Sequence, residues 1–203
     1  MLRYAITDRS TLAGTETERC QALLSLVRQW ATQDIAYIQM REKDLPEPEQ
    51  LALARDILQI LHAASSPCRL LINSHAGIAL AAGADGVHLT SAPDAPTPAQ
   101  IRALFAQSSR PRPVVSVSCH TRADVARARD QQADLILFGP VFGKTLASEL
   151  VTPAAGLEAL RAACLAAGAV PVLALGGVTP ANTPACLAAG AAGIAGIRLF
   201  ASK

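Results

Sequence analysis

Short apolar runs alternate with longer amphipathic stretches along the whole chain, and this alternation predicts strands and helices in turn. Eight of the apolar runs are bounded by polar or turn-forming residues, as buried strands are. The predicted strands span residues 3–7, 36–40, 69–73, 86–89, 114–118, 135–138, 170–175 and 193–198. The predicted helices span residues 15–33, 47–64, 75–82, 97–106, 122–130, 153–167 and 180–189.

Strands that alternate with helices indicate right-handed parallel crossovers. Eight such units within 203 residues predict a single (β/α)₈ barrel domain that occupies residues 1–203, at the short end of the range for this fold. Hydrophobic residues make up 51% of the chain and aromatic residues only 3%. The interior must therefore be built from Ala, Leu, Val and Ile, as in closed parallel barrels.

Two dipeptides and one loop refine this picture. Thr97-Pro98 and Thr179-Pro180 each place a capping hydroxyl before a proline, which suits the first position of a helix. The segment 139–152 is the longest without a strong pattern, and such a loop in a barrel commonly acts as a lid or ligand clamp. Its Gly143 and Lys144 are candidates for phosphate contact.

Composition and charge exclude several classes of partner. The net charge of +2 is dispersed, without the basic block and interleaved aromatic residues of nucleic-acid surfaces. Five scattered cysteines without CxxC spacing favour neither a zinc site nor a disulfide scaffold. No apolar run has the length of a membrane span, and the first residues lack a signal-peptide core. We expect a soluble cytoplasmic protein without nucleic-acid or membrane partners.

Active sites of (β/α)₈ barrels form where the strands end, and the last two predicted strands end in glycine or polar residues. Gly176 and Gly177 close one strand, and Ile197 and Arg198 close the next. Residues without a Cβ let the backbone approach a ligand phosphate closely, so these ends predict a phosphorylated small molecule. The alternative is that the glycines only shape tight turns between strand and helix.

Cationic and titratable side chains follow other strands. Arg41 and Lys43 occupy alternate positions from which both reach an anionic ligand; the alternative is an ion-paired rim with the intervening Glu42. His120 follows the fifth strand, where an imidazole can transfer a proton near neutral pH. His88 is the weaker candidate for a catalyst, because a buried histidine there equally suits a bond to the backbone of a neighbouring strand.

The strand-end residues place the chain in a known context, because it resembles the thiamine phosphate synthase/TenI superfamily over nearly its full length. The matching motifs are ordered along the chain. They are YAITD (4–8), IQMREKD (38–44), LLIN (70–73), AAGADGVHL (81–89), VSCH (117–120), FGPVF (138–142) and VLALGG (172–177).

The resemblance implies a (β/α)₈ barrel that handles the phosphorylated thiazole half of thiamine, with two activities among its members. Synthases couple a pyrimidine diphosphate to thiazole phosphate with magnesium, and use an aspartate after the third-strand asparagine and another after the fourth strand. Ser74 and Pro93 occupy those positions here. Neither residue suits Mg²⁺, although Asp94 substitutes for the second aspartate if the alignment shifts by one residue.

TenI-like proteins tolerate both departures, so the resemblance favours a thiazole tautomerase that needs neither metal nor organic cofactor. It implies that His120 is the acid and base of the proton shift. It further implies that phosphate binds at Gly176, Gly177, Ile197 and Arg198, and that Arg41, Lys43, Asn73, Ser118, Gly139 and Lys144 contact the substrate.

Three activities remain open at this point: the tautomerase, the magnesium-dependent thiamine phosphate synthase, and a non-catalytic regulator that binds a thiazole or thiamine phosphate. The incomplete set of synthase residues motivates the third alternative. Paired copies are common among small barrels, so a homodimer is a further expectation.

Overall fold

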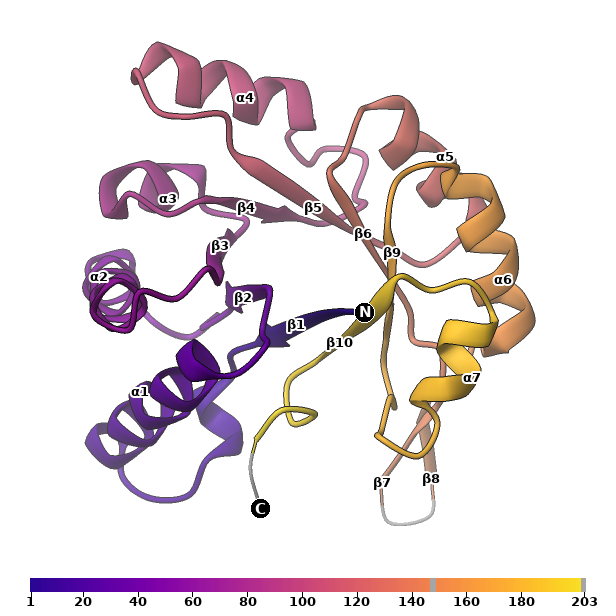
Figure 1. The fold of residues 1–203 in the computed structure, drawn as a ribbon, viewed down its shortest axis with the longest axis horizontal. Helices are drawn as coiled ribbons and strands as arrows, with labels where there is room; N and C mark the ends of the chain where they lie inside the picture. Colours follow the sequence, from indigo (N-terminus) through magenta and orange to yellow (C-terminus); the bar gives the residue numbers. More distant parts are fainter. Residues whose placement is uncertain (147–148, 202–203) are drawn as a thin grey trace.

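The computed structural model describes residues 1–146 and 149–201 and forms a closed barrel of eight parallel strands (Figure 1). Neighbouring strands pair in the order β1-β10-β9-β6-β5-β4-β3-β2, which confirms the predicted (β/α)₈ architecture. The barrel strands are β1 (Leu2–Ile6), β2 (Tyr37–Met40), β3 (Arg69–Asn73), β4 (Gly86–Leu89), β5 (Val114–Cys119), β6 (Leu135–Phe138), β9 (Val172–Leu175) and β10 (Gly193–Gly196).

Helices surround the strands on the outside of the barrel (Figure 1). They are α1 (Glu16–Thr32), α2 (Glu47–Ala63), α3 (Ala76–Ala82), α4 (Pro98–Gln107), α5 (Arg122–Asp130), α6 (Gly156–Ala167) and α7 (Thr183–Ala188), with a short 3₁₀ helix η1 (Arg9–Thr11). Thr15, Thr97 and Thr121 begin α1, α4 and α5 with full capping boxes, in which the threonine hydroxyl and the third helical side chain satisfy each other's backbone N–H groups.

The apolar core has two parts. The larger part lies between the strands and the helices and includes the buried Trp30, Ile57 and Phe105. The smaller part fills the barrel interior with inward-facing side chains, as expected when alternate residues of each strand point to opposite faces. Its buried members are Tyr4, Ile6, Leu71, Val114, Leu135, Leu137, Leu173 and Ala195.

Polar side chains interrupt this interior on one half of the barrel. Gln39 on β2, His88 on β4 and Ser116 on β5 are all buried. On β6, β9 and β10 the corresponding interior residues are apolar, among them Leu137 and Leu173. The polar half therefore carries the hydrogen-bonding chemistry, and the apolar half closes the opposite wall.

The structure departs from the sequence predictions in the segment 139–152 and at several element ends, since β9 begins at Val172, β10 ends at Gly196 and α6 begins at Gly156. The segment predicted as an unpatterned loop contains an antiparallel hairpin, β7 (Lys144–Leu146) and β8 (Glu149–Thr152), which projects away from the barrel (Figure 1). Helix α7 begins at Thr183 rather than at Pro180, because Thr179 and Asn182 first form a reciprocal turn. The Thr179 N–H donates to Asn182 Oδ1 at 2.8 Å, and the Asn182 N–H donates to Thr179 Oγ1 at 3.3 Å.

Across the described residues, no helix combines the length and the apolar character needed to cross a bilayer.

Candidate functional site

A cavity of about 610 Å³ opens at the carboxyl ends of the strands, where active sites of this architecture form. Five of the residues selected from the sequence line it: Arg41, Lys43, Asn73, Ser118 and His120. The other described lining residues are Ile6, Gln39, Ser74, His88, Thr90, Ser91, Ala92 and Leu175. We call this space the mouth cavity.

His120 stands at the edge of the mouth cavity with a defined protonation pattern. Its side-chain Nδ1 lies 2.6 Å from the carbonyl oxygen of Gly139. Because a carbonyl oxygen can only accept, Nδ1 carries the hydrogen, and in the neutral ring Nε2 keeps its lone pair. The backbone N–H of His120 also donates to Asp124 Oδ2 at 3.2 Å, and this bond fixes the residue just before α5. The ring is therefore oriented with one nitrogen ready to accept a proton.

Gly139 serves this histidine through its backbone. It was predicted to contact substrate, but it is absent from the described lining of the mouth cavity. A Cβ at this position would lie 2.2 Å from the carbonyl oxygen of Leu175, so glycine is required where the end of β6 approaches the end of β9.

Arg41 and Lys43 reach the mouth cavity because Glu42 turns the other way. Glu42 is 3% exposed and accepts from the backbone N–H of Arg9 at 3.1 Å and from its guanidinium at 3.0 Å. The predicted alternative of an ion-paired Arg-Glu-Lys rim is therefore wrong. Among the described carboxylates, none pairs with Arg41 or Lys43, which leaves both charges for an anionic ligand.

Arg9 stabilises the segment after β2 by binding Glu42 and Asp44. Its guanidinium binds Asp44 through two bonds of 2.8 and 2.9 Å, and it also contacts Glu16. Burial alone would lower the pKa of Arg9, but the bonds to Asp44, Glu16 and Glu42 outweigh that effect and raise it. The hydrogen bonds from Arg9 also hold the pKa of Asp44 below its ordinary value. A permanently charged, buried arginine thus positions the segment that carries Arg41 and Lys43.

Asn73 and Gln39 form the polar floor of the mouth cavity. Gln39 Nε2 donates to Asn73 Oδ1 at 2.8 Å, and Asn73 Nδ2 donates to the Ser74 hydroxyl at 3.2 Å. The Gln39 Oε1 atom is buried and has no partner among the described residues. A buried acceptor of this kind favours a bound donor, from a ligand or from water.

His88 borders the inner end of the mouth cavity and is buried within the barrel. Sequence reasoning suggested a bond to the backbone of a neighbouring strand; the structure shows bonds to the side chains of Ser116 and Ser118 on β5, each at 2.8 Å. Burial, aided by the Arg41 charge, lowers the pKa of His88 to about 3. This ring is therefore neutral at physiological pH.

The predicted phosphate-binding residues lie outside the described lining of the mouth cavity. Gly176 and Gly177 follow β9 with φ of 88° and 65°, and their positions are crowded by Pro140 and Phe142. The glycines thus do shape the turn, as the alternative held. Strand β10 ends at Gly196, so Ile197 and the exposed Arg198 fall in the turn that follows it rather than in the strand. Contact of all four residues with phosphate stays a prediction.

Lys144 begins β7, and its side chain lies outside the described residues. Its predicted contact with substrate is therefore untested. The same holds for the side chains of the whole hairpin.

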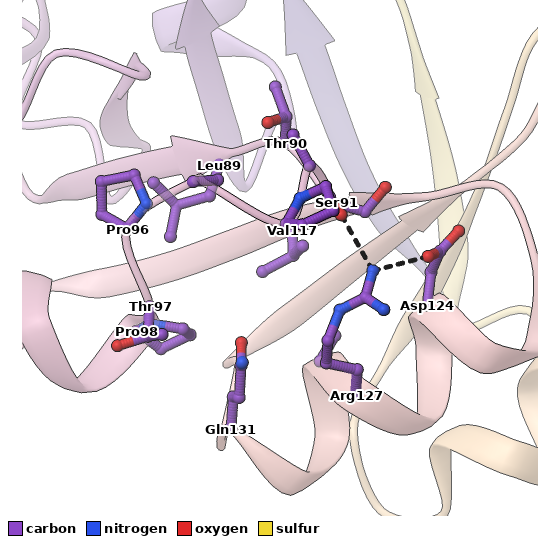
Figure 2. A pocket seen from close by; sticks show the side chains of 14 residues that line it. Leu89, Thr90, Ser91, Pro96, Thr97, Pro98, Val117, Asp124, Arg127 and Gln131 are labelled. Atoms are coloured by element: carbon purple, nitrogen blue, oxygen red, sulfur yellow. Dashed lines mark hydrogen bonds and ion pairs between the residues drawn. The ribbon is translucent and has the colours of Figure 1, made fainter.

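A second, smaller cavity of about 190 Å³ lies behind the loop between β4 and α4 (Figure 2). Arg127 on α5 donates to the carbonyl oxygen of Ser91 at 2.8 Å and to Asp124 at 2.7 Å. Burial works to raise the pKa of Asp124, but donors from Thr121, His120 and Arg127 outweigh it and lower the pKa. Arg127 and Asp124 together therefore link the loop that carries Ser91 to the backbone of His120.

Comparison with known proteins identifies the family. The family model described as thiamine monophosphate synthase matches residues 4–200 of the chain. The chain belongs to the thiamine monophosphate synthase family. A relative from Geobacter sulfurreducens, named a putative thiamine-phosphate synthase, is 41% identical over 192 residues, which cover 95% of this chain and 83% of that protein. One from Aquifex aeolicus, named putative thiamine-phosphate synthase 2, is 33% identical over 97% of this chain and 96% of its own length.

Solved structures agree on the fold. The chain superposes on a thiamine phosphate pyrophosphorylase from Pyrococcus furiosus with a TM-score of 0.77 and 24% identity, covering all of this chain and 88% of that one. A 3-hexulose-6-phosphate synthase follows with a TM-score of 0.63 and 21% identity, over 97% and 89% of the two chains. At these identities the likeness establishes the barrel alone.

A Mg²⁺ ion that bridges to a substrate diphosphate is held by carboxylates of the protein, so its site would require such side chains at the mouth cavity. Ser74, at the first expected position, carries a hydroxyl, and Asp94 is exposed on the loop without lining the mouth cavity. The described lining contains no Asp or Glu. Over the same described part of the chain, no three His, Cys, Asp or Glu side chains form a metal-binding group. These residues do not fit a magnesium diphosphate complex.

The sequence did not identify Arg9, Tyr4 or Ser116 as contributors to the site. Arg9 follows the YAITD motif directly, but its partners lie more than thirty positions away at Glu42 and Asp44. Tyr4 and Ser116 occupy alternate, inward positions of their strands, and this alternation was the one signal that could have singled them out.

Proposed function

We propose that this member of the thiamine monophosphate synthase family is a thiazole tautomerase, which aromatises a thiazole carboxylate phosphate without metal or organic cofactor. The observation that carries the proposal is the content of the mouth cavity: one oriented proton-transfer group, His120, stands beside two unpaired cations, and the described lining lacks carboxylates. A proton shift requires that combination, whereas coupling to thiazole phosphate with departure of diphosphate also requires groups that hold Mg²⁺ on the leaving diphosphate.

The reaction moves one proton and leaves the composition of the substrate unchanged. His120 Nε2 takes a proton from one ring carbon as that C–H bond breaks and the electron pair shifts through the substrate. The same nitrogen returns the proton to the exocyclic carbon, where the new C–H bond forms and the ring becomes aromatic. While His120 is doubly protonated, its Nδ1–H bond to the Gly139 carbonyl stabilises the cation and holds the ring in place.

Binding of the substrate uses the remaining groups. In this proposal Arg41 and Lys43 bind the carboxylate, since both line the cavity and lack an intramolecular carboxylate partner among the described residues. In this proposal the phosphate binds toward Gly176, Gly177, Ile197 and Arg198, which lie at the ends of β9 and β10. Asn73 and Ser118 contact the ring system from the floor of the cavity.

A second candidate function is thiamine phosphate synthase, and the names of the relatives favour it. The retained Arg41, Lys43 and Asn73 are compatible with a diphosphate substrate. Against it stand Ser74 and Asp94, which do not furnish the cavity with carboxylates. The tautomerase accounts for both the residues that are present and those that are replaced.

A paired turnover assay separates these functions. Purified protein receives thiazole carboxylate phosphate with EDTA, and separately thiazole phosphate plus hydroxymethylpyrimidine diphosphate with Mg²⁺. We expect product in the first mixture only, loss of that product in His120→Gln, and normal turnover in His62→Gln, which alters an exposed histidine outside the mouth cavity. Magnesium-dependent coupling as the only reaction would establish the synthase. Absence of product in both mixtures, with retained binding of thiazole phosphate, would establish a non-catalytic binding protein.

A further inference from the structure

A chain of four polar side chains runs from the centre of the barrel to the floor of the mouth cavity. The Tyr4 hydroxyl lies 3.0 Å from Ser116 Oγ, Ser116 Oγ lies 2.8 Å from His88 Nδ1, and His88 Nε2 lies 2.8 Å from Ser118 Oγ. The Tyr4 hydroxyl also lies 3.4 Å from His88 Nδ1. Tyr4, Ser116 and His88 are at most 3% exposed, and Ser118 is half-buried. Of the four side chains, His88 and Ser118 line the cavity.

The two titratable side chains of this hydrogen-bond chain, Tyr4 and His88, are both uncharged. Burial lowers the pKa of His88 to about 3, and burial raises the pKa of Tyr4, so the imidazole is neutral and the phenol is protonated. A neutral imidazole has one N–H donor and one acceptor nitrogen. The open question is which of the two nitrogens of His88 carries the hydrogen.

The hydrogen bonds among Tyr4, Ser116 and His88 determine which nitrogen carries the hydrogen. Tyr4 Oη, Ser116 Oγ and His88 Nδ1 contact one another, and within the described residues neither hydroxyl has another acceptor. If Nδ1 carried a hydrogen, three donors would converge and one buried hydroxyl would have no acceptor, which is costly. If Nδ1 is the acceptor, both hydroxyl hydrogens are satisfied. The hydrogen must therefore be on Nε2.

The position of this hydrogen fixes the role of the Ser118 hydroxyl, at the cavity end of the hydrogen-bond chain. His88 Nε2–H donates to Ser118 Oγ, so the Ser118 hydroxyl uses a lone pair toward the interior and has its own hydrogen to donate elsewhere. Among the described residues no protein acceptor receives that hydrogen, and Ser118 borders the mouth cavity.

We propose that Tyr4, Ser116 and His88 form a directed hydrogen-bond chain that sets Ser118 as a donor toward the ligand, so that the site selects a ligand with an acceptor atom at this point. Tyr4, Ser116 and His88 are then positioning residues that act through Ser118. The statement about the ligand rests on the proposed function, whereas the direction of the chain does not.

The direction is tested by the tautomer of His88, read from long-range ¹H–¹⁵N correlations of ¹⁵N-histidine-labelled protein, with His88→Gln used to assign the signals. We expect the hydrogen on Nε2 and a lone pair on Nδ1. A hydrogen on Nδ1, or a doubly protonated ring at neutral pH, overturns the proposal. The measurement needs no substrate, so it stands apart from the outcome of the turnover assay.

The consequence for the ligand is tested by kinetics with thiazole carboxylate phosphate. Ser118→Ala removes one neutral hydrogen bond and is expected to raise KM about 3- to 10-fold. Ser118→Thr, which keeps the hydroxyl, is expected to restore most of the loss. Ser116→Ala is expected to raise KM in the wild-type background but to add little to Ser118→Ala.

Two results contradict this part of the proposal. Fully additive effects of Ser116→Ala and Ser118→Ala would show that the serines act independently. Equal KM values for wild-type protein and Ser118→Ala would show that the ligand does not accept from this hydroxyl. Tyr4→Phe, which removes only the distal hydroxyl, repeats the test if Ser116→Ala fails to fold.

Discussion

The imidazole of His120 donates from Nδ1 to the carbonyl oxygen of Gly139 across 2.6 Å. This contact joins the end of β5 to the end of β6 and leaves Nε2 as the basic nitrogen at the mouth cavity. A backbone carbonyl oxygen is not protonated near neutral pH, so it keeps accepting from Nδ1, and the ring orientation would persist through the proposed reaction, in which Nε2 gains and loses a proton.

Replacing His120 by glutamine should therefore remove the proton carrier without removing bulk. We expect turnover of thiazole carboxylate phosphate to fall by about 100- to 10,000-fold, the usual contribution of a general acid and base. Binding of thiazole phosphate, measured by calorimetry, should stay within about threefold of wild type, because the cations and the cavity floor remain. A variant that turns over normally would assign the proton transfer to another group.

The buried pair of Arg9 and Glu42 should reveal itself as a coupled unit. Arg9→Met leaves the Glu42 carboxylate buried without its cation, so we expect the free energy of unfolding to fall by about 3 to 5 kcal/mol. In Arg9→Met/Glu42→Gln the uncharged amide can still accept from the backbone N–H at position 9, and much of that loss should disappear. Urea unfolding of the single and double variants measures the coupling. Simple additivity would mean that the pair does not hold the loop.

The neutral, buried ring of His88 should make the stability of the fold decrease at acid pH. Its pKa in the folded chain is about 3 against an ordinary value of 6.5, because burial and the nearby Arg41 disfavour the charged ring. Between these values the unfolded chain binds a proton that the folded chain does not, so stability rises with pH and is lost as pH falls from 6.5 toward 3. The full effect is on the order of 4 kcal/mol.

The His88 contribution can be isolated by comparing pH profiles of stability. His88→Gln should be less stable than wild type at pH 7, yet it should lose less stability between pH 6.5 and pH 4. His62→Gln, at an exposed position, should follow the wild-type profile. Parallel profiles for wild type and His88→Gln would contradict the assignment of a neutral buried ring.

Gly177 tests whether the turn after β9 is crowded as well as left-handed. Its φ is 65°, and a Cβ there would lie 2.7 Å from the Cβ of Phe142. Gly156 has a similar φ of 85°, but no described atom lies within 4 Å of its Cβ position. Gly156→Ala should lose about 1 kcal/mol from backbone strain, and Gly177→Ala should lose clearly more. Equal losses in thermal unfolding would show that Phe142 moves aside freely.

The barrel was predictable from sequence because its signals are local. Each strand is an apolar run closed by a turn signal, and the strands at Arg69–Asn73, Gly86–Leu89 and Leu135–Phe138 have the predicted bounds. The hairpin was missed because β7 (KTL) and β8 (ELVT) are short and neither is a continuous apolar run. The start of α7 was missed because Thr179 caps a turn before the helix rather than the helix itself.

The candidate site was predictable only in part, for a related reason. Asn73 ends a strand, and Arg41 and His120 directly follow one. Parallel strands place all such residues at one face of the barrel. The hydrogen-bond chain joins Tyr4 to Ser116, which are 112 positions apart and meet only because the barrel closes. Likewise, the inward turn of Glu42 depends on Arg9, and no spacing within the IQMREKD motif signals it.

The central claim is that His120 carries a proton from one carbon of a thiazole carboxylate phosphate to another, and a conversion in D₂O with EDTA tests it most directly. NMR of the product locates any deuterium. We predict metal-free formation of the aromatic thiazole by wild-type protein, with hydrogen carried from the ring carbon rather than deuterium from the solvent at the newly protonated exocyclic carbon, and a rate reduced at least 100-fold in His120→Gln. Absence of this product, together with magnesium-dependent formation of thiamine phosphate by the same preparation, would contradict the account.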